Sequence, residues 1–244
     1  MICFAFFVPM LSHQSTTVEL QAAIIELRRG AARSPDFNVL KKRIKSFQNK
    51  RLEKTHQNLL DDESTACAAR FFLDKLYCTD DVSKRDHQTE RVLPKLEKLL
   101  PSAALLVLTK VIYMDYLAEY LDDELTHKIM SMHGLVEVDS NQELYVHGFC
   151  EQNRWAEREV QIRLIVEVGE SLRKLLRLPF LSGLLKMTRG AAQKANLEDF
   201  HDFLSEGLRA FSTLKRPGDF FRAIERQEMA LLEAMKAGTL DRLV

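Results

Sequence analysis

Residues 159–176 read EVQIRLIVEVGESLRKLL, and this stretch decides the fold class. Its apolar positions recur at spacings of three and four residues, which is the period of one face of an α-helix. These positions are Ile162, Ile165, Val166, Gly169, Leu172, Leu175 and Leu176. The pairs Glu159–Arg163 and Glu170–Lys174 place an acid four residues before a base, which stabilises a helix surface. The stretch therefore predicts one long amphipathic helix over about 142–178, ended by Pro179.

The same helical period extends outward over most of the chain. Only nine glycines and six prolines occur in 244 residues, so few positions interrupt it. Helices are predicted over about 16–29, 37–60, 64–77, 85–99, 102–113, 115–132, 142–178, a short stretch after 179, 196–211 and 217–235. Residues 134–140 resemble a strand but are too short to establish a sheet. The predicted fold class is all-α, a bundle of about eight to ten helices in a single domain over 16–244. An N-terminal helical subdomain that ends near residue 60 is the alternative.

Residues 1–15 are predicted to be an apolar N-terminal tail outside this domain. The run MICFAFFVPML at 1–11 is shorter than the roughly 20 apolar residues that span a bilayer. It has no Lys or Arg, whereas a signal peptide begins with a positive region. We expect an accessory strand, a poorly ordered tail or a misassigned start codon.

The composition is that of an ordinary globular protein. The 35 Lys and Arg residues balance the 35 Asp and Glu residues, whereas proteins dedicated to nucleic acid are usually basic. The spacing of the four cysteines, Cys3, Cys67, Cys78 and Cys150, fits no zinc motif. A chain of this length needs no disulfide framework, so reduced thiols and a cytoplasmic location are expected.

The balance of charge conceals a strong segregation along the chain. Residues 28–54 contain ten Lys or Arg and two acids, whereas 113–143 contain eight acids and Lys128 alone. Residues 171–197 contain six basic residues and no acid. The acidic segment could face the basic 171–194 segment within the fold.

Residues 71–77 read FFLDKLY, and Asp81, Arg85–Asp86 and Arg91 follow. This pattern resembles a family of uncharacterised bacterial helical proteins whose signature is roughly FFLxDLYG, a short loop, RD, and then an Arg and an LP. The similarity covers about 35–236, including the stretches 156–161, 166–169, 203–207 and 224–228. The chain departs from the signature at Lys75 and Cys78. The resemblance implies a helical fold and gives no activity.

The first candidate for a binding site follows from this signature. Arg85 and Asp86 open a helix, and arginine presents a planar fork of donors that suits carboxylate or phosphate. If the helices meet, a small polar pocket for an anionic ligand would form from Tyr77, Arg85, Asp86, Arg91, Arg158 and Glu159. The alternative is a buried ion-pair network that fixes the helix register.

The second candidate is a surface. Residues 171–194 combine a leucine-rich face with the basic residues Arg173, Lys174, Arg177, Lys186, Arg189 and Lys194. A basic amphipathic segment can lie on a membrane or dock on an acidic partner. Pro179 and Gly183 interrupt it, so a buried helical elbow with solvated charged ends explains the same pattern.

No catalytic or metal motif is assembled in the sequence. The pairs Glu124–His127 and Glu198–His201 have the spacing of di-iron helix bundles, but two pairs are close to chance. Ser171 and Lys174 imitate a nucleophile motif without its companions. The basic helix near Lys41, Lys42 and Arg43 lacks an aromatic platform for nucleic acid. No metal and no cofactor are therefore predicted.

The leading functional hypothesis is a non-catalytic cytoplasmic protein that binds another protein or a second copy of itself. One alternative is a small-anion ligand-binding protein or enzyme with its pocket near Arg85 and Arg158. The other is peripheral membrane association through 171–194.

Overall fold

A computed structural model describes residues 11–12, 15–29, 34–77, 82–138, 141–177 and 181–239, without the side chains of 181, 182 and 184. Eleven α-helices and one π-helical segment, η1, make up this part of the chain, and it contains no strand. The elements are α1 (Thr17–Arg29), α2 (Pro35–Thr55), α3 (Gln57–Asp61), α4 (Ala66–Phe71), η1 (Phe72–Leu76), α5 (Ser83–Leu99), α6 (Ser102–His133), α7 (Gln142–Gln152), α8 (Trp155–Leu175), α9 (Leu181–Lys194), α10 (Glu198–Ser212) and α11 (Pro217–Lys236). The predicted all-α class is confirmed, whereas most of the predicted N-terminal tail, residues 1–10, lies outside the described residues.

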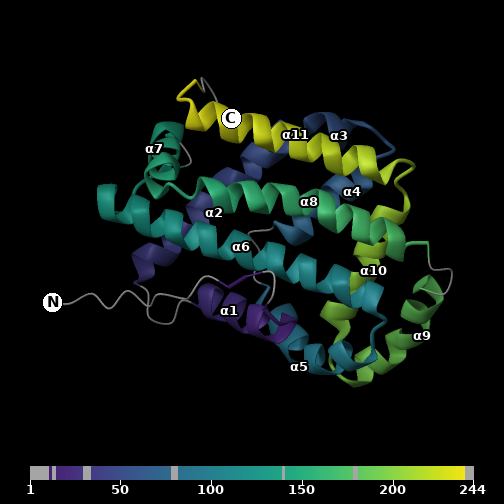
Figure 1. The fold of residues 1–244 in the computed structure, drawn as a ribbon. Coiled ribbons are helices and arrows are strands. Elements are labelled where there is room, and N and C mark those ends of the chain that lie inside the picture. Colours follow the sequence, from purple (N-terminus) through teal and green to yellow (C-terminus); the bar gives the residue numbers. More distant parts are fainter. Residues whose placement is uncertain are drawn as a thin grey trace.

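Helix α6 is the central element of the fold (Figure 1). It contacts α1, α2, α7 and α8, and α11 packs on the other side of α8. The prediction of two helices over 102–132 was wrong, because the 32 residues of α6 contain no glycine or proline and nothing interrupts the backbone hydrogen bonds. One rigid helix therefore carries side chains to two separate parts of the core.

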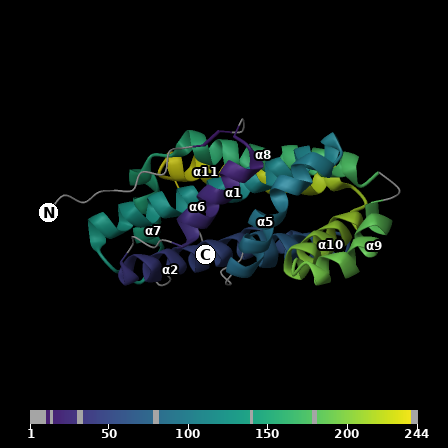
Figure 2. The ribbon, with the colours of Figure 1, turned by 90° about the horizontal axis from the view of Figure 1, so that it is seen from below.

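The helices form two layers (Figure 2). Helices α8 and α11 lie on one side, and α2, α9 and α10 lie on the other. A large apolar cluster joins α1, the first half of α6, α8, α10 and α11. A smaller cluster joins α2, the second half of α6, α7 and the end of α11. Helices α1 and α2 both bury their apolar faces against α6. The division of the chain into domains stays a prediction.

Two helix boundaries differ from the sequence prediction. The helix expected over 142–178 is divided into α7 and α8, since Asn153 adopts a left-handed conformation with φ of 52° and ends α7. The helix expected over 37–60 breaks at His56, whose backbone leaves the helical region and whose ring contacts Glu228 of α11. Neither position carries a glycine or proline, so local sequence gives little sign of them.

Helices α8 and α11 approach closely at Gly169, and substituting this residue gives a testable result. A Cβ at this position would overlap the ring of Phe221. We expect Gly169→Ala to lower the free energy of unfolding by about 1–3 kcal/mol through overpacking. Gly190→Ala in α9 is the matched control, because a Cβ there has nothing within 4 Å and the helix gains from alanine. Urea unfolding measures both, and equal stabilisation of the two variants would contradict the packing assigned to Gly169.

Candidate functional site

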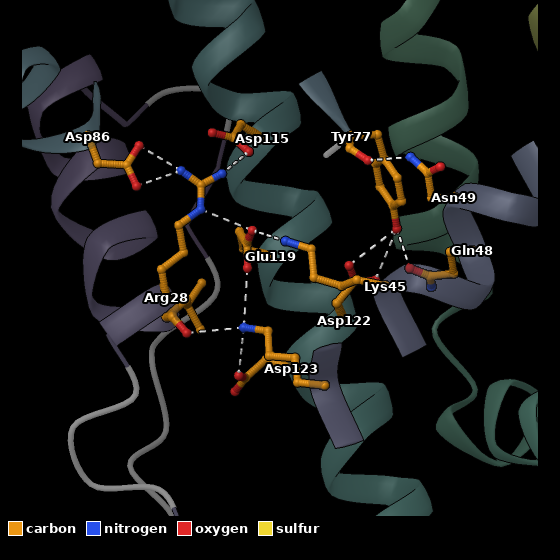
Figure 3. Close-up of polar contacts among 12 residues, drawn as sticks. Arg28, Lys45, Gln48, Asn49, Tyr77, Asp86, Asp115, Glu119, Asp122 and Asp123 are labelled. Carbon is orange, nitrogen blue, oxygen red and sulfur yellow. Dashed lines mark hydrogen bonds and ion pairs between the residues drawn. The ribbon is translucent and has the colours of Figure 1, made fainter. Parts of the chain in front are cut away.

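A π-helical turn fixes the position of Tyr77. The amide of Tyr77 donates to the carbonyl of Phe72, five residues earlier, at 3.0 Å. The widened turn leaves other carbonyls for side chains, and Asn49 Nδ2 donates to Leu73 O at 3.2 Å and Tyr77 O at 2.9 Å (Figure 3). Single π-helical turns within α-helices often occur at functional sites. Here the turn lies in the FFLDKLY segment that the sequence analysis selected.

The Tyr77 hydroxyl points toward α2 and α6. It donates to Gln48 Oε1 and lies 3.2 Å from Asp122 Oδ2 (Figure 3). Burial of the hydroxyl and the nearby Asp122 carboxylate raise the pKa of Tyr77 well above its usual value. The side chain is therefore a neutral donor at physiological pH.

Arg28 of α1 is held by three carboxylates from two other helices (Figure 3). Its Nη1 donates to both oxygens of Asp86 at 2.7 and 2.8 Å, and Nη2 donates to Asp115 at 2.6 Å. Its Nε donates to Glu119 at 3.0 Å. Burial alone would lower the pKa of Arg28, but the three carboxylates outweigh this effect and raise the pKa well above the usual value.

Two lysines of α2 complete the network around Glu119. Lys45 Nζ lies 2.5 Å from Glu119 Oε1. Lys41 Nζ lies 3.2 Å from Glu119 Oε2 and 3.2 Å from Asp123 Oδ1. Burial alone would raise the pKa of Glu119, but Lys45, Lys41 and Arg28 outweigh it and hold the pKa far below its usual value.

The acidic segment 113–143 therefore pairs mainly with the basic segment 28–54, rather than with 171–194. Arg43 of α2 continues this pairing by lying 2.5 Å from Glu137. Lys110 of α6 pairs with Glu167 of α8, and neither residue belongs to the acidic segment 113–143 or to the basic segments 28–54 and 171–194. The charge segregation seen in the sequence is thus largely an arrangement of mutually neutralising helix faces.

These side chains surround a cavity of about 320 Å³ between α1, α2, α5 and α6, which we term the charged cavity. Its volume lies in the range of small-molecule sites. Its lining includes four carboxylates and six Lys or Arg side chains, namely Asp86, Asp115, Glu119, Asp122, Arg28, Arg29, Lys41, Lys42, Lys45 and Arg85. The lining of the charged cavity therefore carries two more cationic than anionic side chains.

The excess positive charge lies toward the exposed rim of the charged cavity. Arg29 and Lys42 are exposed, and Arg85 is half-buried. In the part of the chain that the structure describes, none of the three forms an ion pair with a carboxylate. The Nη2 of Arg29 lies 3.1 Å from Nε2 of the His87 ring. The interior charges are therefore paired, while the rim cations are available.

The structure brings some of the predicted ligand-binding residues together and separates others. Tyr77, Arg85 and Asp86 line the charged cavity. Arg158 does not line the charged cavity but a neighbouring one, to which Tyr77 also contributes. Arg91 lies outside both, where its Nη2 donates to Ala195 O at 3.2 Å. Glu159 lies on the surface and pairs with Arg163 at 2.7 Å.

Several residues of the site were not predicted from the sequence. Arg28, Lys45, Glu119 and Asp122 contribute to the charged cavity but belong to no motif. Their only signal was the opposite charge of two distant segments. Charge alone does not show which segments meet, because that depends on the packing of α1 and α2 against α6.

The predicted partner or membrane surface lies at the end of α8 and along α9. Arg173 is half-buried, and Lys174, Arg177, Lys186 and Arg189 are exposed. Met187 of α9 is 83% exposed between two of these cations. No helix among the described residues is both long and apolar enough to cross a membrane. Contact of this surface with a protein, a second copy or a membrane stays a prediction, as does the absence of nucleic acid binding.

The two Glu–His pairs do not meet in one place. Glu124 pairs with Arg154 at 3.0 Å, whereas His201 lies on α10 with its Nε2 2.8 Å from Leu185 O. Within the described ranges, no three or more His, Cys, Asp or Glu side chains are grouped so as to hold a metal ion.

The fold and the site together define a class: an all-helical bundle with a charged cavity of ligand size at its centre. The chain belongs to the family described as Domain of unknown function (DUF8198), whose model matches residues 27–242. All ten charged side chains of the cavity lie within this range. The match supports the prediction that the chain belongs to an uncharacterised family. The bacterial origin of that family and its FFLxDLYG signature stay predictions. Comparisons with curated proteins and with solved structures gave no match.

Proposed function

We propose that this protein is a cytoplasmic ligand-binding protein that holds a small anion in the charged cavity. The observation that carries the proposal is the available positive charge at the rim, where Arg29, Lys42 and Arg85 lack carboxylate partners among the described residues. Two of the four cysteines, Cys67 and Cys150, are described, and both are free thiols, which favours a reducing compartment.

The geometry of Arg85 favours a phosphate or carboxylate group. Its guanidinium carbon lies 4.6 Å from the centre of the Phe203 ring, and Nη1 donates to Lys75 O at 3.0 Å. These contacts restrict the side chain before any ligand arrives, which lowers the entropic cost of binding. An arginine held in this way can present its remaining donors to two oxygens of one anion.

The proposal is tested by titrating inorganic pyrophosphate into the protein at low salt, with calorimetric detection. Hydrogen bonds to charged groups contribute about 1.5–3 kcal/mol, so Arg85→Ala is expected to weaken binding by about 10- to 100-fold. Arg91→Ala is the matched control, since Arg91 lies on the same helix but outside the cavity. Absence of pyrophosphate binding to the unaltered protein, or equal effects of the two substitutions, would overturn the proposal.

A further inference from the structure

Arg158 of α8 is a buried cation with unused hydrogen-bond donors. It is 7% exposed, and its Nε and Nη2 have no hydrogen-bond partner among the residues that the structure describes. Nη1 is the only nitrogen of the group that makes a hydrogen bond, to Gln161 Oε1 at 3.3 Å among the described residues. A buried donor without a partner costs about 1–3 kcal/mol, and more when it is charged. Such a group therefore points to a missing acceptor.

The two unused nitrogens lie on one edge of the guanidinium. Nε and Nη2 together form the fork that binds both oxygens of a carboxylate. The nearest carboxylate, Asp122, has one oxygen 3.9 Å from Nη2, beyond hydrogen-bonding distance. Packing of the guanidinium over the Phe149 ring, 5.0 Å from its centre, holds this edge in place.

Arg158 lines a cavity of about 100 Å³, which we term the Arg158 cavity. Its second arginine, Arg51, is already occupied, because Nη1 lies 2.6 Å from both oxygens of Glu228. Tyr77 and Tyr145 also line this space. Among the described residues, Arg158 is thus the cation of this cavity whose unused donors are fully buried.

An apolar cavity of about 220 Å³ adjoins the Arg158 cavity. Every residue in its lining is apolar, and the lining comes mainly from α4, α5, α6, α8, α9, α10, α11 and the π-helical turn. The two cavities share the walls formed by Phe72, Leu76, Val111, Met114 and Ile165. An apolar lining of this kind offers water no hydrogen-bond partners and favours apolar molecules. The buried cation therefore lies at one end of a hydrocarbon-like space.

The length of this space is set by α6. Ala104 lines the apolar cavity and Ala118 lines the Arg158 cavity. At about 1.5 Å per residue along a helix, these positions are about 21 Å apart. Three bonds of an extended chain span about 3.5 Å. The distance thus corresponds to about 18 bonds, which is long enough for an unbranched chain of about 16–18 carbon atoms.

We propose that the Arg158 cavity and the apolar cavity together bind a long-chain fatty acid. The carboxylate accepts hydrogen bonds from Nε and Nη2 of Arg158, and the hydrocarbon chain extends along α6 between α8 and α10. The occupant is a single chain with an anionic head, because a buried cation with unused donors lies in a cavity that adjoins an apolar one. This site differs from the charged cavity, although the two cavities share walls formed by Leu76, Tyr77, Asp115 and Ala118. The proposal does not rest on pyrophosphate binding.

The test compares palmitate with its methyl ester as competitors of a fluorescent fatty acid probe, cis-parinarate. The unaltered protein is expected to bind palmitate about 10- to 100-fold more tightly than the ester, because the ester cannot form charged hydrogen bonds. Arg158→Met keeps the packing over Phe149 and is expected to abolish this preference. Arg163→Met is the control, since Arg163 lies on the surface of the same helix. The ratio of acid to ester is measured within each variant, so a loss of stability does not imitate the result.

A second pair of variants tests the position of the hydrocarbon chain. Ala104→Phe fills the apolar cavity from α6 and is expected to weaken palmitate binding by at least 10-fold. Ala103→Phe adds the same ring at the neighbouring exposed position and is expected to change nothing. The proposal is overturned if the unaltered protein binds acid and ester equally, if Arg158→Met keeps the preference, or if Ala104→Phe binds palmitate as Ala103→Phe does.

Discussion

Replacing Glu119 with glutamine is expected to lower the free energy of unfolding by about 3–5 kcal/mol, the usual cost of breaking a buried ion pair from one side. Glu119 is 2% exposed and lies between Lys41, Lys45 and Arg28. Glutamine has nearly the same volume, so the packing is preserved and the change isolates the charge. Lys45 would lose its one ion pair among the described residues, whereas Arg28 would keep Asp86 and Asp115.

Urea unfolding at pH 7 measures this change. Glu159→Gln is the control, because Glu159 forms a solvent-exposed pair with Arg163 and such pairs contribute at most about 1 kcal/mol. A Glu119 variant no less stable than the Glu159 variant would show that the network does not hold α1, α2 and α6 together.

The second large effect concerns Glu228 of α11 and depends on pH. Burial alone would raise the pKa of Glu228, but Arg51 and His56 outweigh it and lower the pKa from 4.5 to about 2. A carboxylate with a lowered pKa stabilises the folded state above its unfolded pKa and loses this contribution as pH falls toward the folded pKa. The difference corresponds to about 3 kcal/mol at pH 7.

The prediction is a stability gap between the unaltered protein and Glu228→Gln that closes with acidity. The gap is expected to be about 3 kcal/mol at pH 7 and to shrink between about pH 4.5 and pH 2, because protonated glutamate resembles glutamine. Other carboxylates titrate in both proteins and cancel in the comparison. Urea unfolding at several pH values measures the gap, and Glu53→Gln, in the exposed pair with Arg70, is the control. A gap that stays constant from pH 7 to pH 3 would contradict the role of Glu228.

Local pattern was sufficient for the fold class and for several helix boundaries. The predicted helix over 16–29 corresponds to α1, and the helix expected to end before Pro101 is α5. Pattern failed where a boundary depends on tertiary contact or on a single backbone conformation. The ring of His56 contacts Glu228, which lies 172 residues further along the chain. Asn153 adopts a left-handed backbone conformation that is uncommon for residues other than glycine.

For the candidate site, the sequence supplied only part of the constellation. The signature segment gave Tyr77, Arg85 and Asp86, which the fold brings to one cavity. The sequence around Arg158 does not show that this arginine is buried with unused donors. It directly follows Ala156 and Glu157, which do not mark a buried helix face. The pairing of α2 with α6 was equally invisible, since segregated charge indicates that partners exist without saying which ones.

The network around Arg28 also bears on the speed at which the protein folds and unfolds. The three carboxylates that bind Arg28 lie 58, 87 and 91 residues further along the chain. Contacts between residues so far apart in the sequence form only after large loops have closed. Closing these loops costs conformational entropy before the contacts stabilise the chain. Interactions absent from the folding transition state act mainly by slowing unfolding. We therefore expect the buried charges of this protein to lengthen the lifetime of its native state more than they change the rate at which that state is reached.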